Sequence, residues 1–169
     1  MTVIAGVDFL NTSLSPFVQV EDENRIRFSI DDLSLKEFKL LLLALNRNLS
    51  TMAFSKRKVG WGKVKPYYLY RFMRIPSWSV HSCAIDRLYF AVVRNLRQRD
   101  IEQFYKAYRR KVHMPLVTYF YNEDTFIRIS PFYVDIISDD VTLIAHLRSS
   151  FSNRVTDFDG VLPISEEEW

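Results

Sequence analysis

Ser34-Leu35-Lys36-Glu37-Phe38-Lys39-Leu40-Leu41-Leu42-Leu43-Ala44-Leu45 is the stretch that decides the fold. Ser34 and Glu37 have the spacing of a capping box, in which the serine hydroxyl and the glutamate carboxylate each accept the other residue's amide. Apolar side chains then recur at helical spacing: Leu35, Phe38, Leu41, Leu42, Leu45 and Leu49, with Leu40 and Leu43 widening the stripe. The pattern predicts a central core helix over residues 35–51.

The residues before this helix alternate in the manner of a strand. Residues 25–30 place apolar side chains on one face, with Arg25 and Arg27 on the other, facing solvent or a partner. Residues 17–20 precede a turn-like acidic patch at 21–24, so the sequence predicts a hairpin here.

The stretch after the helix is less regular. Residues 55–62 are basic and interrupted by glycine, which indicates an exposed loop. The tyrosine-rich run 63–75 favours a strand, although Pro66 also suits the first position of a short helix. Residues 76–79 read as a connection, and residues 83–93 as a further strand or buried segment.

The second half of the chain predicts two helices and one clear hairpin. Asp100 with Gln103 indicates a helix start, and residues 116–121 with 125–130 predict strands joined by a tight turn. Asp139 or Asp140 can cap a last helix near residues 141–151. The expected fold is α+β: a single compact domain over residues 1–169, with antiparallel hairpins packed against two or three amphipathic helices. We expect an N-terminal arm at 1–15 and an acidic, partly mobile tail at 152–169.

Charge is distributed unevenly along the chain. Residues 1–55 carry five basic and seven acidic side chains, residues 56–115 carry fifteen and three, and residues 116–169 carry three and ten. A strongly basic centre between acidic ends suits an anionic partner or head-to-tail self-association. The alternative is that the acidic ends fold onto the basic middle.

The basic centre contains one stretch in which cations and aromatic rings interleave, at residues 56–71. Lysine and arginine neutralise phosphates, while tryptophan and tyrosine stack on bases or settle at a lipid interface. The candidate contact residues are Lys56, Arg57, Lys58, Trp61, Lys63 and Lys65, with a second patch at Arg109, Arg110 and Lys111. The alternative is that these rings belong partly to the core and the lysines merely solvate a loop.

Little in the sequence supports catalysis or a bound cofactor. The three histidines are far apart, no phosphate-binding glycine motif is present, and the single cysteine, Cys83, excludes an internal disulfide. His81 and Cys83 share a face if they lie on one strand, which makes a nucleophilic pair formally conceivable. We expect no enzyme activity, no metal and no cofactor. The longest apolar run, Leu40–Leu45, is too short to span a membrane.

As a pattern of elements, residues 24–135 resemble the matrix proteins of rhabdoviruses or a smaller accessory relative. The resemblance rests on a strand leading into an amphipathic helix, the basic loop 56–63, and the run Lys65-Pro66-Tyr67-Tyr68-Leu69. His81-Ser82-Cys83 and the basic segment 109–111 before the hairpin follow in the same order. The long lysine-rich arm and the P-P-x-Y motif usual in that family are missing.

The resemblance implies a non-enzymatic viral protein that self-associates and binds nucleocapsid RNA or an acidic membrane surface. It further implies a location in the host cytoplasm, at a membrane periphery or in the virion. The alternative is a module that engages a host or other partner protein without binding RNA or lipid. A second, shorter similarity joins Met114-Pro115-Leu116-Val117, the following hairpin and Val161-Leu162-Pro163 to a segment of lantibiotic dehydratases.

Overall fold

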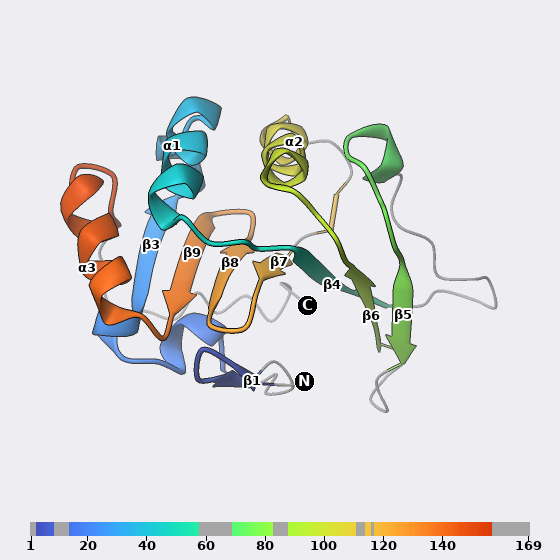
Figure 1. Ribbon diagram of the computed structural model, residues 1–169, viewed down its shortest axis with the longest axis horizontal. Helices are drawn as coiled ribbons and strands as arrows, with labels where there is room; N and C mark the ends of the chain where they lie inside the picture. Colours follow the sequence, from blue (N-terminus) through green and yellow to red (C-terminus); the bar gives the residue numbers. More distant parts are fainter. Residues whose placement is uncertain are drawn as a thin grey trace.

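The computed structural model describes residues 3–8, 14–57, 69–82, 88–110, 114–115 and 117–156, with the backbone alone at 55–57, 82 and 88–89. Its centre is a seven-stranded antiparallel sheet (Figure 1). The strand order is β3 (Arg25–Ser29), β9 (Tyr133–Ser138), β8 (Thr125–Ile129), β7 (Thr118–Tyr121), β4 (Thr51–Arg57), β6 (Leu88–Val93) and β5 (Ser79–Ser82).

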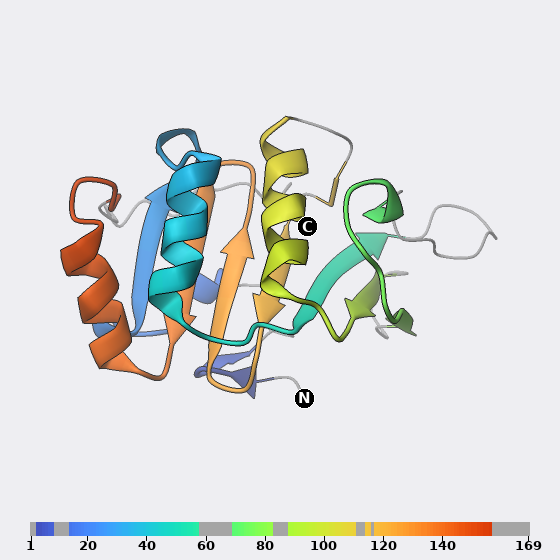
Figure 2. The ribbon, with the colours of Figure 1, turned by 45° about the horizontal axis from the view of Figure 1, so that its top comes forward.

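Three helices cover one face of this sheet: α1 (Leu35–Leu45), α2 (Gln98–Arg109) and α3 (Val141–Ser150). Figure 2 shows them side by side, with α1 in the middle. A short hairpin of β1 (Val3–Ile4) and β2 (Val7–Asp8) lies against the opposite face (Figure 1). The predicted α+β single domain is therefore confirmed.

The start of α1 is as predicted, and its end is not. Ser34 and Glu37 form both hydrogen bonds of the capping box, and Phe38, Leu41, Leu42 and Leu45 are buried. The helix stops six residues before the predicted end, because Asn46 adopts a left-handed conformation with φ of 47°. The chain then enters β4 at Thr51.

The predicted hairpin between residues 17–20 and 25–30 is wrong. Residues Pro16–Val18 form a 3₁₀ turn, η1, and a second turn, η2 (Asp22–Asn24), leads directly into β3. The partner of β3 is β9, with Arg27 opposite Asp135. Arg27 is also buried rather than facing solvent, because Asp135 binds it and the Phe17 ring covers it.

The hairpin of β7 and β8 confirms the strands predicted at 116–121 and 125–130. Asn122 closes its turn by accepting from the amides of Asp124 and Thr125 through its side chain. The strand that follows, β9, was not predicted. Residues 125–138 thus form a second hairpin whose outer strand pairs with β3.

The segment between α1 and β6 differs from expectation. Strand β4 extends through Arg57, so residues 55–57 belong to the sheet rather than to an exposed loop. Residues Leu69–Arg71 form a 3₁₀ turn, η4, and no strand covers 72–75, so the strand predicted for 63–75 is wrong where the structure describes it. Residues 58–68 and 83–87 lie outside the described part of the chain.

Both remaining helices begin near the predicted positions. The first residue of α2 is Gln98, and Asp100 sits inside the first turn, where its carboxylate accepts the amide of Arg97 at 2.8 Å. Asp140 rather than Asp139 caps α3, by accepting from the amides of Thr142 and Leu143. Asp100 is therefore a capping carboxylate, although not at the position that the sequence indicated.

The sheet is buried on both faces along β8 and β9. On the helix face lies the main core, which includes Phe28, Phe38, Phe54, Phe104 and Phe120. On the other face a second cluster joins Ile4 and Val7 to Tyr119, Phe126 and Ile137. Because both faces of β8 and β9 are buried, a shift of one residue would expose apolar side chains, so the register of these strands is fixed.

Candidate nucleic-acid interface

The contact residues predicted from the basic-aromatic stretch lie mostly where the structure gives no description. Lys58, Trp61, Lys63, Lys65 and Lys111 fall outside the described ranges. Lys56 and Arg57 end β4, where the backbone register places them opposite Tyr89 and Leu88 of β6. Their part in binding stays a prediction.

Arg109, predicted for a second patch, has a structural role. Its guanidinium donates to the carbonyl of Ile30 at 2.7 Å and to that of Leu33, which ties α2 to the 3₁₀ turn η3 (Ile30–Asp32). The Tyr105 hydroxyl donates to the same Leu33 carbonyl, and burial raises the pKa of that phenol. Arg110, at the end of α2, is exposed, and its contact with an anion stays a prediction.

Three other arginines converge at the junction of β6 and α2. Arg74 donates to the carbonyl of Asn95 at 2.7 Å and approaches Asp100 at 3.4 Å. Arg97 approaches the same Asp100 oxygen at 3.6 Å. Arg94 donates to the hydroxyl of Ser79 at 3.3 Å, on the neighbouring strand β5. Two more exposed arginines lie close to these three in the chain, Arg71 in η4 (Leu69–Arg71) and Arg99 in α2. We call Arg71, Arg74, Arg94, Arg97 and Arg99 the arginine cluster.

The backbone of this junction is held from several sides. Asn95 adopts a left-handed conformation with φ of 60°, which asparagine tolerates better than most residues. The Leu96 amide donates to the carbonyl of Ser50 at 2.9 Å, and the Leu96 side chain is buried. The Arg94 amide donates to the hydroxyl of Ser77. The arginines therefore project from a fixed loop.

The arginine cluster runs against the electrostatic preference of a helix start. A helix N-terminus carries partial positive charge, which favours acidic side chains and disfavours basic ones. Arg97 and Arg99 flank the first residue of α2, and Asp100 is the acidic residue of its first turn. The Asp100 side chain is only 4% exposed, so its carboxylate is turned inward while the guanidiniums face water. An incoming anion would meet the cations first.

The uneven charge of the sequence persists across the described fold. Residues 69–82 and 88–110, which build β5, β6 and α2, contain two acidic side chains, Asp100 and Glu102, and eight basic ones: Arg71, Arg74, Arg94, Arg97, Arg99, Lys106, Arg109 and Arg110. Residues 117–156, which build β7, β8, β9 and α3, contain three basic and five acidic side chains. One end of the sheet is therefore basic.

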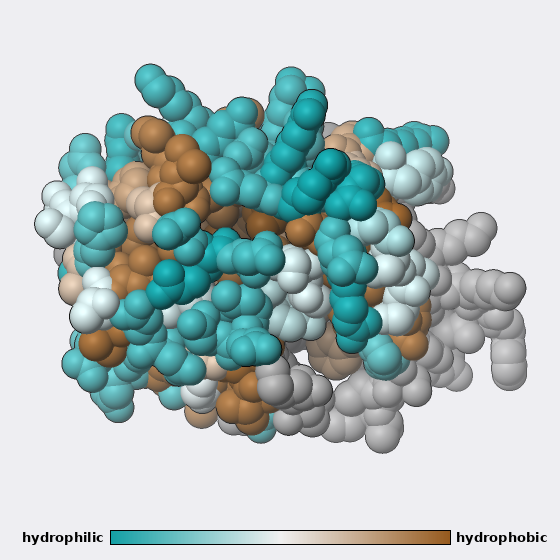
Figure 3. All heavy atoms as spheres, in the orientation of Figure 1, coloured by the Kyte–Doolittle hydropathy of each residue, from teal (hydrophilic) through white to brown (hydrophobic). Residues whose placement is uncertain are grey.

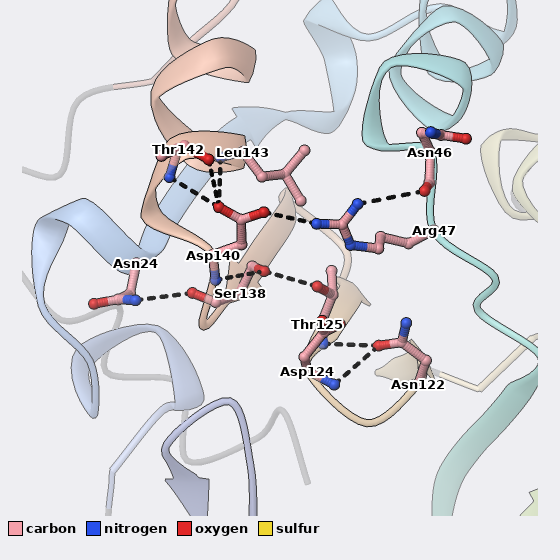
Figure 4. Close-up of polar contacts among 10 residues, drawn as sticks. All are labelled: Asn24, Asn46, Arg47, Asn122, Asp124, Thr125, Ser138, Asp140, Thr142 and Leu143. Atoms are coloured by element: carbon pink, nitrogen blue, oxygen red, sulfur yellow. Dashed lines mark hydrogen bonds and ion pairs between the residues drawn. The ribbon is translucent and has the colours of Figure 1, made fainter.

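A polar network at the start of α3 has a structural explanation. Arg47, just after α1, donates to Asp140 at 2.7 Å, and Asp140 caps α3 (Figure 4). Thr125 and Ser138 share a buried hydrogen bond below it, and Asn24 donates to the Ser138 carbonyl. These contacts join three elements and leave their polar atoms bound to one another.

Sites for other chemistry are weak in the described residues. His81 lies exposed on β5, with its Nε2 3.3 Å from the Ser79 hydroxyl, and Cys83, its suggested nucleophilic partner, lies outside the description. Across the described ranges no three potential metal ligands come together. No helix in these ranges is long and apolar enough to cross a membrane.

Part of the arginine cluster is visible in the sequence as basic residues at an expected helix start. Arg94, Arg97 and Arg99 precede a helical stripe within six residues, at a place where acidic residues are usual. Only the fold shows that Arg74, twenty residues earlier, joins them. Comparisons with protein-family models, with curated proteins and with solved structures give no match to this chain.

Proposed function

We propose that the protein binds RNA through the arginine cluster and has no catalytic role. The observation that carries the proposal is the convergence of Arg74 and Arg97 on one inward-facing carboxylate, Asp100, with Arg94 held beside them at Ser79. Guanidinium groups match phosphate geometry, and several held on one rigid loop neutralise successive phosphates of a backbone. With the resemblance to rhabdovirus matrix proteins, this suits a matrix-like or accessory protein that contacts nucleocapsid RNA in the host cytoplasm.

RNA is favoured over an acidic membrane by the kind of side chains beside the cluster. Tyr70, 63% exposed, precedes Arg71 in η4 and offers a ring on which a base can stack. Membrane association needs a continuous apolar surface beside the cations. In the described chain the exposed apolar side chains near the arginine cluster are isolated ones, Val80 of β5 and Leu43 of α1, which shares a groove with Gln98. Trp61 and the lysines of 58–65 lie outside the described part of the chain and are not needed for this proposal.

The test is fluorescence anisotropy with a labelled oligouridine of about 20 nucleotides, long enough to supply a phosphate for each arginine of the cluster. The double variant Arg97→Gln/Arg99→Gln should bind about tenfold more weakly at low salt, because two phosphate contacts are lost. The urea midpoint of the same variant should change little, because the loss of positive charge at a helix N-terminus offsets the loss of the exposed Arg97–Asp100 contact.

A matched control is Lys36→Gln/Lys39→Gln, which also removes two exposed cations, from α1. Its affinity for oligouridine should stay within about twofold of the unmodified protein, apart from the small effect of net charge. Equal binding by the unmodified protein and the arginine variant would contradict the proposal. Tight binding to phosphatidylserine vesicles with no affinity for RNA would assign the cluster to a membrane instead.

A further inference from the structure

We propose a second binding surface, on the outer side of α1, that takes an acidic amphipathic helix of a partner protein. Leu40 and Leu43 of α1 are 48% and 63% exposed, although leucines on the opposite side of the same helix fill the core. Figure 3 shows the hydrophobic surface over α1. The two leucines lie one turn apart on α1, so they form one small apolar patch on its outer side rather than two scattered residues.

A groove runs beside these leucines, between the end of α1 and the start of α2. Its volume is about 360 Å³, and its apolar lining is Leu42, Leu43, Leu49 and Ile101. Leu43 thus both lines the groove and stands at its edge. A groove between two packed helices suits a third helix, whose apolar side chains at i, i+3, i+4 and i+7 would enter it.

The charges around the groove favour a partner helix that is negatively charged. The rest of the lining is Asn46, Arg47, Asn48 and Gln98, with no acidic residue. Arg47 is bound to Asp140, so the cations open to a partner are those beside the groove. Lys36 and Lys39 lie on α1, and Arg97 and Arg99 flank Gln98 in the chain. The nearest carboxylate on α2, Glu102, is already bound by Gln98 at 3.0 Å and by Lys39 at 3.8 Å. A helix with glutamate or aspartate beside its leucines therefore complements this surface.

A second copy of the chain is a poorer occupant. If two copies met through this surface about a two-fold axis, the cations of one copy would face the same cations of the other. Like charges opposed in an interface are costly. The two surfaces share the cations Arg97 and Arg99, but none of the residues that line the groove belongs to the arginine cluster. Binding of a helix in the groove therefore goes beyond RNA binding and does not require it.

The test uses a fluorescein-labelled designed helix of about 18 residues, with leucine at the four stripe positions of each two turns and glutamate and alanine elsewhere. The full-length protein should bind it, and Leu43→Ser should weaken binding about tenfold. Methyl resonances of Leu42, Leu43, Leu49 and Ile101 should shift on titration. The matched variant Val141→Ser removes an exposed apolar side chain from α3 and should bind the helix normally.

Two results would overturn the inference. One is equal affinity for this helix and for a version with lysine in place of glutamate. The other is a self-association, seen by analytical ultracentrifugation, that Leu43→Ser abolishes, because a second copy would then occupy the surface. Leu43→Ser keeps every arginine of the arginine cluster and should bind oligouridine normally, so a failed helix-binding test leaves the RNA proposal intact.

Discussion

Asp135 is the residue whose environment departs most from the usual pattern of this sheet. It lies fully buried on β9 between Arg27 of β3 and Arg128 of β8, directly opposite both in the strand register. Arg27 binds its two oxygens at 2.7 and 2.9 Å, and Arg128 approaches at 3.4 Å. The Arg27 guanidinium is also held between the rings of Phe17 and Tyr133, each 4.1 Å away.

Replacing Asp135 should be severely destabilising. In Asp135→Ala two buried guanidiniums lose their shared counter-charge, and we expect a loss of about 3–5 kcal/mol in the free energy of unfolding. Urea unfolding followed by circular dichroism measures it. Asp139→Ala removes an exposed carboxylate four residues later and should cost less than about 0.5 kcal/mol. A similar small loss in both variants would show that the buried arrangement contributes little.

At the scale of single elements, the sequence identifies helix starts better than helix ends. Ser34 and Asp140 cap α1 and α3 through short-range hydrogen bonds, which leave a local signature. The end of α1 has a weaker signature: Asn46 suits a left-handed helix end, but the apolar stripe continues past it to Leu49. The helix ends here because Leu49 is buried in the core and β4 pairs with β7. Both contacts involve residues far away in the sequence.

The cap of α3 makes stability depend on pH. The hydroxyl of Thr142, then the Leu143 amide and to a lesser degree Arg47, lower the pKa of Asp140 below its ordinary value of 3.8. Because the folded-state pKa is the lower one, this contribution is present above the unfolded-state pKa and is lost as pH falls through the folded-state pKa.

We therefore expect Asp140→Asn to be less stable than the unmodified protein at pH 7, with a difference that narrows below about pH 4. Urea midpoints measured between pH 7 and pH 3 check this. Thr142→Val removes the hydroxyl donor and leaves the carboxylate. It should also lower the urea midpoint at pH 7, by less than Asp140→Asn does. A difference that stays constant over this range would mean that the charge of Asp140 is irrelevant to the cap.

At the scale of the whole molecule, local pairings could be predicted and long-range ones could not. The hairpin of β7 and β8 follows from two alternating runs around Asn122. The pairing of β3 with β9 joins residues more than a hundred positions apart, and nothing local indicates it. Arg27 was predicted to face solvent for the same reason, because alternation does not reveal that η1 covers the second face.

For the candidate site, too, the sequence predicted the region and not the residues that the fold brings together. Charge counting located the basic region, and the described part of that region is indeed rich in exposed arginines. The residues predicted for contact and those found in the cluster are different. The composition pointed to residues 56–65, whereas the fold brings Arg74 to the loop that carries Arg94 and Arg97. Arg109 looked like a contact residue and is bound to backbone carbonyls.

The β3 edge of the sheet is covered in a way that bears on self-association. The outer edge of β3 is occupied by the chain itself: Val155 bridges to Phe28, and the Thr156 amide donates to Arg27 at 2.8 Å. Arg148 donates to the Arg25 carbonyl beside it. Pairing with a second copy through β3 would displace these contacts, so head-to-tail association through this edge is disfavoured.

The salt dependence of RNA binding tests the central claim most directly. For single strands the slope of log K against log salt concentration is about −0.7 per phosphate neutralised. The account predicts that Arg97→Gln/Arg99→Gln makes the oligouridine slope less steep by about 1.4, while Lys36→Gln/Lys39→Gln leaves it unchanged. The same slope for the unmodified protein and both variants would contradict the assignment of RNA binding to the arginine cluster.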